Sequence, residues 1–253
     1  MDDTKLALAL VTGAAEVAVA MREGALMPEQ KTSTADLVTA ADRAAEKHVH
    51  DVLRRERPDD GMTGEEGADW AGRNHRRWVA DPIDGTYNYV SGLPAWCSAV
   101  ALEEAGRLSV GAACIPSSGE TWIAANGQVQ LNGARVEPIA DRALSECSVA
   151  TYLDAESVRD SSTMGVLLTV VGAAATLRMS GSGTCDLADV AADRLGLWIQ
   201  NDCDDWDWLP GRALVEGVGG RTAVVLHAGH RWHIAGSPRA VAKALQLIQE
   251  SRG

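Results

Sequence analysis

Phenylalanine is absent from this chain of 253 residues, and tyrosine occurs three times, whereas tryptophan occurs eight times. The core must therefore be built from Leu, Val, Ala and Trp. Hydrophobic residues still make up 46% and charged residues 23% of the chain, which is typical of a soluble globular protein. The length suits two closely fused halves, and a composition shift predicts an N-terminal α+β half (1–142) and a C-terminal α/β half (143–253).

The cysteines lack any C-x-x-C pair, and their odd number and wide spread argue against a disulfide framework. They are Cys97, Cys114, Cys147, Cys185 and Cys203. We expect reduced thiols and a cytoplasmic protein. The first thirty residues lack a basic start followed by an apolar run, so we expect no signal peptide. We also expect no apolar run long enough to cross a membrane.

Basic residues are in the minority, because 23 Lys and Arg face 35 Asp and Glu, for a net charge of −12. The sequence has no stripe of Lys and Arg interleaved with aromatic residues, so we expect no nucleic-acid partner. The same acidity would discourage a phosphorylated substrate unless a bound cation reverses the local charge.

Apolar residues at helical spacing predict helices over residues 3–25 and 39–57. A C-terminal helix is predicted to begin at Pro238, with Ser237 as its cap. The stretch "RRWVADP" predicts a strand that ends at Pro82, because proline cannot donate to a sheet ladder.

Antiparallel sheet is predicted further along the chain, from about residue 97 onwards. Apolar runs there are separated by turn residues, namely Gly106, Asn126-Gly127 and Asn132-Gly133. We find no internal repeat and no low-complexity linker.

The stretch "DPIDGTYNYVSGLP" places Asp81 and Asp84 three residues apart where the predicted strand ends. Gly85 permits a tight turn, and Thr86 is expected to cap a helix. Carboxylates and the carbonyl of Ile83 are suitable ligands for Mg²⁺, and amides at a helix start can bind phosphate. The corner therefore suits metal-assisted phosphate hydrolysis. The alternative is a capped turn, which is the usual role of an isolated Asp-Pro or Asp-Gly pair.

Three segments in this order, "GEEG", "DPIDGTYNYVSGLP" and "WDWLPGRALVEGVGG", resemble the signatures of the inositol monophosphatase family. "KTSTADLVTAADRAAEKHV" and "RMSGSGTCDLADVAADRLG" are similar to its N-terminal and substrate-side segments, so the resemblance covers nearly the whole chain. It implies an α+β fold, a layered α/β/α/β/α sandwich of the inositol monophosphatase and fructose-1,6-bisphosphatase type. It also implies a lithium-sensitive, Mg²⁺-dependent phosphatase that is usually a homodimer.

The resemblance implies two to three Mg²⁺ ions per site. Glu65, Asp81 and the carbonyl of Ile83 match ligands of the first ion. Asp81, Asp84 and Asp207 match ligands of the second. A third, weaker ion is expected near Glu65, held largely by water.

The resemblance also implies catalytic roles. Thr86 and Glu65 match the pair that positions the attacking water, and Asp42 matches the acid that hydrogen-bonds the threonine. Lys31 and Asp36 lie on a matching loop near the metal site. The residues implied to contact the substrate are Asp84, Gly85, Thr86, Gly181, Ser182, Gly183, Gln200 and Asp207.

Some residues depart from the family pattern or have another interpretation. Gln200 stands where inositol phosphatases commonly place a glutamate. Pro210 replaces a small residue at what is expected to be the first turn of a helix. We expect Glu66 to be an exposed neighbour of Glu65, and Asp186 to be a surface or capping group.

The implied reaction is in-line attack of a metal-activated water on the phosphate ester of a small alcohol, with myo-inositol 1-phosphate as the first choice. Histidinol phosphate is the alternative, since the same scaffold serves both and an acidic pocket would favour an amino alcohol. Adenosine bisphosphate and fructose bisphosphate are third options. A non-catalytic metal or phosphate binder is the alternative from another class, and the presence of Glu65, Thr86 and Asp42 argues against it.

Overall fold

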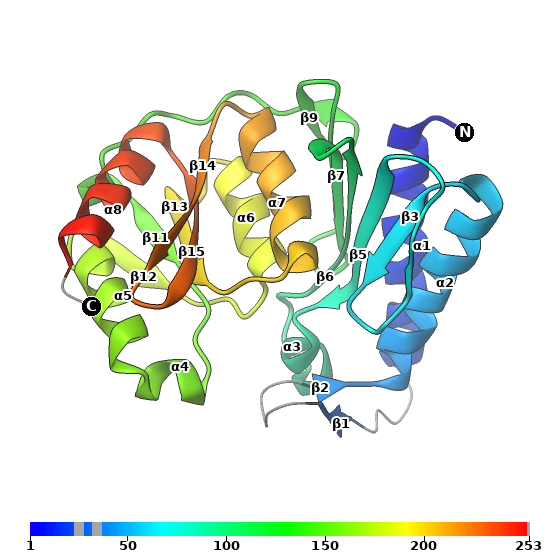
Figure 1. The fold of residues 1–253 in the computed structure, drawn as a ribbon, viewed down its shortest axis with the longest axis horizontal. Coiled ribbons are helices and arrows are strands. Elements are labelled where there is room, and N and C mark those ends of the chain that lie inside the picture. Colours follow the sequence, from blue (N-terminus) through cyan, green and yellow to red (C-terminus); the bar gives the residue numbers. More distant parts are fainter. Residues whose placement is uncertain (23–27, 32–36, 252–253) are drawn as a thin grey trace.

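The structure is a computed structural model, and it describes residues 1–22, 28–31 and 37–251. Its helices and sheets form five layers, helix, sheet, helix, sheet and helix (Figure 1). On one outer side lie α1 (Asp3–Arg22) and α2 (Ala40–Glu56), and on the other lie α5 (Ser161–Val171) and α8 (Pro238–Glu250). Helices α6 (Gly183–Ala191) and α7 (Asp205–Gly217) lie between the two sheets. The predicted layered sandwich is confirmed.

The larger sheet has eight strands in the order β10-β9-β8-β7-β6-β5-β3-β4. They are β3 (Gly61–Gly64), β4 (Asp69–Trp70), β5 (Arg76–Asp84), β6 (Cys97–Glu104), β7 (Arg107–Ile115), β8 (Glu120–Ala125), β9 (Gln128–Leu131) and β10 (Ala134–Arg135). Neighbours are antiparallel except for β3 and β5, which are parallel. The predicted turns at Gly106, Asn126-Gly127 and Asn132-Gly133 are confirmed, each with positive φ.

Strand β5 does not end at Pro82, as predicted, but continues to Asp84. Asp81 is opposite Ala99 and Asp84 is opposite Cys97, so β5 carries one extra residue there and forms a bulge. Pro82 lies inside this bulge, where its missing N–H breaks no regular ladder bond. Because of the bulge, Asp81 and Asp84 both lie in the last four residues of β5.

The smaller sheet has five strands in the order β12-β11-β13-β15-β14. They are β11 (Ser148–Ala150), β12 (Thr176–Arg178), β13 (Leu197–Asn201), β14 (Arg221–His227) and β15 (His230–Gly236). The remaining elements are β1 (Glu29–Gln30), β2 (Leu37–Val38), α3 (Thr86–Ser91), α4 (Ala155–Arg159) and a 3₁₀ turn, η1 (Leu144–Glu146). The proposed boundary at residue 142 falls between β10 and η1.

Helix α1 is long and apolar enough, by length and composition alone, to cross a membrane. The expectation that no such run exists is therefore wrong. In this fold Leu6, Leu10 and Ala14 are buried in the core against the eight-stranded sheet and α2. A buried core helix passes the same length test. The predicted extension of this helix to residue 25 lies outside the described residues.

Two predicted helix features need correction. Ser237 precedes α8, as predicted, but its side chain makes no cap bond; its hydroxyl donates to the carbonyl of Arg142 at 2.9 Å instead. Pro210 lies inside α7, beyond the first turn, so the helix tolerates the loss of one backbone donor there.

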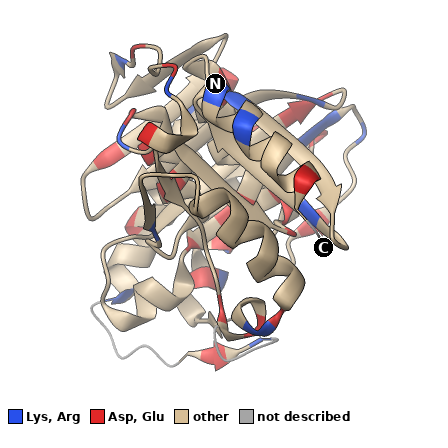
Figure 2. Cartoon of the chain, turned by 90° about the vertical axis from the view of Figure 1, so that its left-hand side faces the viewer, with Lys and Arg blue, Asp and Glu red and all other residues tan. Residues whose placement is uncertain are grey.

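Charged residues of both signs are interspersed on the side of the molecule that Figure 2 draws. Several basic side chains are engaged in ion pairs, such as Arg142 with Asp193 and Arg194 with Glu120. The absence of a nucleic-acid partner stays a prediction.

Candidate active site

Glu65 and Asp81 meet at one edge of the larger sheet. Parallel β3 and β5 pair Gly64 with Ala80, and the amide of Glu65 donates to the carbonyl of Ala80 at 3.2 Å. The residues that follow this pair, Glu65 and Asp81, therefore lie side by side, close enough for each carboxylate to affect the pKa of the other.

Asp81, Asp84 and Asp207 converge, although Asp207 comes from the other half of the chain. One carboxylate oxygen from each lies within 4.8 Å of the others. Asp207 is in the first turn of α7. The neighbouring Trp208 stacks on Trp198 of β13 with ring centroids 5.6 Å apart, and this contact holds the start of α7 against the smaller sheet.

The cluster is electrostatically costly without a cation. Burial raises the pKa of Asp81 well above its usual range, and the neighbouring Glu65, Asp84 and Asp207 raise it further. Burial likewise raises the pKa of Asp207, with Asp84 and Glu65 adding to the effect. Closely spaced carboxylate oxygens are the donors that hard divalent cations prefer, so these residues fit a metal that would neutralise their mutual repulsion.

Thr86 is oriented by a chain of hydrogen bonds that begins at α2. Its Oγ1 lies 3.0 Å from Asp42 Oδ1 and 3.0 Å from the carbonyl oxygen of Ile83. Asp42 is fully buried, and its other oxygen accepts from the amide and hydroxyl of Thr39 in a capping box. Since the Thr86 proton has two protein acceptors, a lone pair of its oxygen stays available to a water molecule.

Gly85 makes the turn between β5 and α3. Its φ is +94°, and a Cβ at this position would lie 2.9 Å from the carbonyl oxygen of Ala95. The predicted turn is therefore confirmed, but Gly85 is the cap and Thr86 is already the first residue of α3.

The loop after β3 is held by a lysine. Lys31 Nζ lies 2.9 Å from Glu65 Oε1 and 2.6 Å from Glu66 Oε1. Burial alone would lower the pKa of Lys31, but the two carboxylates raise it. The side chain of Glu66 is 5% exposed, so the expectation of an exposed residue is wrong. Burial raises the pKa of Glu66 to about 7, opposed by Lys31. Asp36 lies outside the described residues.

Glu46 of α2 also fixes this loop, and sequence analysis missed it. Its Oε1 accepts from the amide of Glu66 at 2.8 Å and its Oε2 from the amide of Ala68 at 2.9 Å. Glu46 is buried. The available signal was its position four residues after Asp42, which places both acids on one helix face.

The start of α6 contacts the carboxylate cluster from the second half of the chain. The amide of Thr184 donates to Asp84 Oδ2 at 2.6 Å, and Ser182 caps the helix by accepting from the amide of Cys185. Asp186, expected to be a surface or capping group, is 3% exposed and so does not lie at the surface. Burial raises the pKa of Asp186 to about 7.

A cavity of about 300 Å³ joins these parts. The predicted site residues that line it are Glu65, Asp81, Ile83, Asp84, Gly85, Thr86, Gly181, Gly183, Gln200 and Asp207. Asp42 and Ser182 are not among the lining residues. Leu37, Tyr87, Tyr152, Asp154 and Glu156 also line the cavity and were not predicted. Leu37 and Tyr87 lie inside quoted segments but were given no role, and no motif covers the other three. No Lys or Arg is among the described residues that line it.

Gln200, at the end of β13, contributes an unused acceptor to the cavity wall. Its Oε1 is buried and has no hydrogen-bond partner among the described residues. A buried polar atom without a partner is costly, so a ligand that donates a hydrogen bond would be stabilised there.

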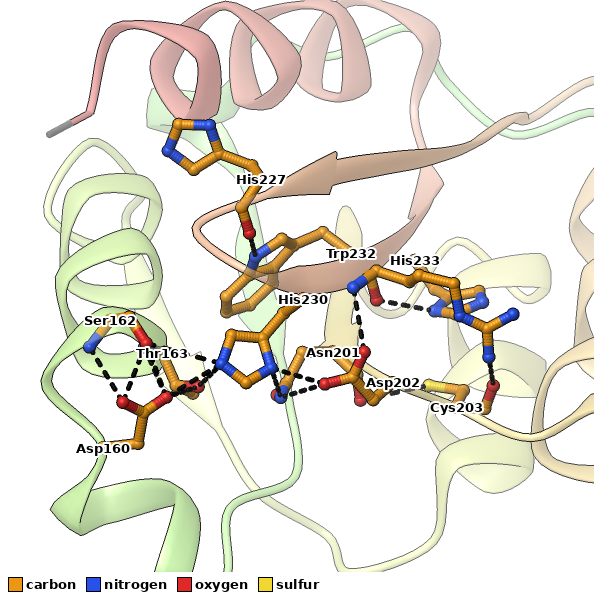
Figure 3. Close-up of polar contacts among 11 residues, drawn as sticks. Asp160, Ser162, Thr163, Asn201, Asp202, Cys203, His227, His230, Trp232 and His233 are labelled. Carbon is orange, nitrogen blue, oxygen red and sulfur yellow. Dashed lines mark hydrogen bonds and ion pairs between the residues drawn. The ribbon is translucent and has the colours of Figure 1, made fainter. Parts of the chain in front are cut away.

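A second cavity of about 420 Å³ adjoins the first and shares Asp154 and Glu156 with it. His230 lies on its wall between two carboxylates, with Nδ1 2.5 Å from Asp202 and Nε2 3.0 Å from Asp160 (Figure 3). Asp202, and then Asp160, raise the pKa of His230. Asp160 also caps α5, so the imidazole ties the start of that helix to the loop after β13.

Comparison with known proteins gives the family. The model of the inositol monophosphatase family matches residues 2–252. This chain belongs to the inositol monophosphatase family.

Three relatives in the family illustrate its range of names. The inositol-1-monophosphatase of Rhizobium meliloti is 36% identical over 189 residues, 74% of this chain and 71% of the relative. The Nus factor SuhB of Escherichia coli is 31% identical over 89% of this chain and 87% of its own length. The histidinol-phosphatase of Mycobacterium tuberculosis is 41% identical over 155 residues, 59% of each chain.

Solved structures of inositol monophosphatase-family proteins share the fold. The IMPase of Thermotoga maritima superposes with a TM-score of 0.86 at 26% identity, covering 99% of this chain and 98% of its own. The extragenic suppressor protein suhB of Bartonella henselae gives 0.88 at 26% identity, over 97% and 98% of the two chains. The similarity therefore extends over both halves of the chain.

Proposed function

We propose that this protein is a Mg²⁺-dependent phosphomonoesterase that hydrolyses the phosphate ester of a small alcohol. The observation that carries the proposal is the convergence of Asp81, Asp84 and Asp207 within 4.8 Å beside the cavity. A cavity lined by carboxylates and by no described Lys or Arg would repel a phosphate ester unless a cation were bound. Phosphatase activity agrees with the family and with the names of its members.

The proposed roles follow from the contacts. Glu65, the three aspartates and the carbonyl of Ile83 would hold the metal ions, which would supply charge neutralisation and lower the pKa of a water molecule. The Thr86 oxygen is free to accept a hydrogen bond from a water molecule in the cavity, because its own proton is directed to protein acceptors. Asp42 keeps the threonine hydroxyl in this orientation.

The first candidate substrate is myo-inositol 1-phosphate. It is supported by the similarity to the Rhizobium meliloti inositol-1-monophosphatase. The unpaired Oε1 of Gln200 on the cavity wall would accept a hydrogen bond from a ring hydroxyl. Gly181 and Gly183 line the same cavity and leave room for the alcohol.

A second candidate is histidinol phosphate, and a specific observation favours it. Asp154 and Glu156 line the cavity and would attract an alcohol that carries a positive charge. The similarity to the Mycobacterium tuberculosis histidinol-phosphatase, at 41% over 59% of each chain, points in the same direction.

A panel of phosphate esters tests both candidates, with kcat/KM measured in Mg²⁺ and in excess EDTA. We expect turnover that requires Mg²⁺. If histidinol phosphate is preferred, Glu156→Gln lowers its kcat/KM several-fold, on the order of the 1 kcal/mol of a partly exposed charge pair, and leaves inositol 1-phosphate unchanged. Glu137→Gln removes the same charge at another exposed position and is the control. Absence of Mg²⁺-dependent release from every ester would favour the non-catalytic binder.

We also propose a cytoplasmic homodimer that is inhibited by lithium and binds neither nucleic acid nor membrane. The support is the family resemblance and the five free cysteines. Sedimentation equilibrium tests the dimer, and inhibition of phosphate release by LiCl tests the lithium sensitivity.

A further inference from the structure

Asn88 joins the two halves of the chain beside the active-site cavity. It lies on α3, three residues after Gly85, and is 5% exposed. Its Nδ2 donates to the carbonyl of Ala95 at 2.6 Å and to the carbonyl of Ser180 at 2.8 Å. A side-chain amide nitrogen has two hydrogens. Both are used here, one in a bond to the N-terminal half of the chain and one in a bond to the C-terminal half.

These bonds lie where two walls of the cavity come closest. We call Gly85 and Thr86 the phosphate wall, and residues 180–183 the alcohol wall. A Cβ on Gly85 would lie 3.2 Å from the carbonyl oxygen of Gly181, and a Cβ on Gly181 would lie 2.7 Å from Asn88 Nδ2. The backbones of the two walls are therefore in near contact, with Asn88 packed against the alcohol wall.

The two walls depend on Asn88 to different degrees. The phosphate wall has further supports, since Thr86 contacts Asp42 and Ile83 at 3.0 Å. In the alcohol wall, Ser180 and Ser182 bond to each other and Ser182 caps α6. The start of α6 is tied to the end of β5 by the amide of Thr184, which donates to Asp84 Oδ2, whereas the carbonyl of Ser180 is held to α3 by Asn88. Loss of the Asn88 amide would therefore shift the Ser180 end of the alcohol wall more than the phosphate wall.

We infer that Asn88 is a positioning residue that sets the separation of the two walls and so determines how well the site discriminates among alcohols. This inference rests on the proposed phosphatase function. Asn88 itself does not line the cavity, so it acts through the backbone that it holds.

The test uses Asn88→Ala, which removes both donors without adding charge, and Asn88→Leu, which restores volume but not the donors. Gln128→Ala, which removes an exposed side-chain amide at the start of β9, is the control. kcat and KM are measured in Mg²⁺ for the preferred alcohol phosphate and for p-nitrophenyl phosphate, together with inhibition by inorganic phosphate.

We expect both Asn88 variants to lower kcat/KM for the alcohol phosphate about tenfold, mainly through KM, because the partly buried carbonyls of Ala95 and Ser180 lose their donors. p-Nitrophenyl phosphate and the inhibition constant of phosphate should change less than about twofold, since the phosphate wall keeps its other contacts. Recovery in Asn88→Leu would show that volume alone matters and would overturn the inference.

The outcomes separate this inference from the function on which it rests. If the wild-type protein releases no phosphate from any ester, the proposed function fails. If the wild type is active and folded Asn88 variants affect both substrates equally, or neither, the inference about Asn88 fails alone. If neither variant folds by circular dichroism, Asn88 serves the fold and not discrimination, and the inference is again overturned.

Discussion

Asp84 Oδ2 accepts a hydrogen bond from the backbone nitrogen of Thr184 at 2.6 Å, across one hundred positions of the chain. Burial raises the pKa of Asp84, and this amide opposes the rise. Thr184 is in the first turn of α6, where a helix favours a negative charge. A carboxylate proposed to bind metal is thus anchored by the opposite half of the chain.

Asp84→Asn tests the role of this carboxylate. The amide oxygen of asparagine can still accept from Thr184, so the melting temperature should change by only a few degrees. Turnover should fall at least about 100-fold, because a charged metal ligand is lost. Asp59→Asn, at an exposed ion pair with Arg73, is the control. Near-normal turnover in Asp84→Asn would contradict the site assignment.

Gln200→Glu tests the alcohol end of the cavity. The substitution places a negative charge at a buried acceptor that has no protein partner. We expect the ratio of kcat/KM between neutral and cationic alcohol phosphates to change several-fold, about 1 kcal/mol, with a smaller change in the Mg²⁺ concentration for half-maximal activity. An unchanged substrate profile would remove Gln200 from the substrate site.

Glu46→Gln tests the support of the Glu65 loop. A glutamine can accept only one of the two backbone hydrogen bonds through its oxygen, so the turn that carries Glu65 should loosen. We expect the rise in melting temperature on adding Mg²⁺ to require a concentration about 3- to 10-fold higher than in the wild type, as for other residues that support metal ligands. Glu16→Gln, on the exposed face of α1, is the control, and an equal Mg²⁺ response in both variants would refute the role of Glu46.

His230 should make stability depend on pH. Asp202 and Asp160 raise its pKa above the usual 6.5, so the folded state binds the proton more tightly than the unfolded state. The stabilisation is fully present below about pH 6.5 and is lost as the pH rises through the higher folded pKa. The wild type should have a higher melting temperature than His230→Gln, and this difference should be larger at pH 6 than at pH 9. A difference independent of pH would show that the ring is not charged between the two acids.

The candidate site was predictable where residues lie in one motif. Asp81, Asp84 and Gly85 come from a single strand-turn-helix corner, and the burial and turn geometry found there follow from local residue preferences. The end of β5 was misplaced because a bulge accommodates Pro82, and bulges depend on the partner strand, β6, which local sequence does not report.

Other residues could not be predicted because their partners are distant in the sequence. The side chain of Glu66 is shielded from solvent where it pairs with Lys31. Asn88 contacts Ser180 only because the two halves of the chain pack together. Asp154 and Glu156 reach the cavity wall through the placement of α4, for which no periodic pattern or motif gives a signal. Tertiary packing therefore supplies Asp154 and Glu156 of the cavity wall, while the motifs supply the clustered carboxylates of Asp81, Asp84 and Asp207.

The most direct test of the central claim is calorimetric titration of Mg²⁺ into chelator-treated wild-type protein and into Asp207→Asn. If Asp207 completes a site with Asp81 and Asp84, the wild type binds Mg²⁺ and the variant binds it at least about tenfold more weakly. Equal binding by the two proteins, or no binding by the wild type, would contradict the account.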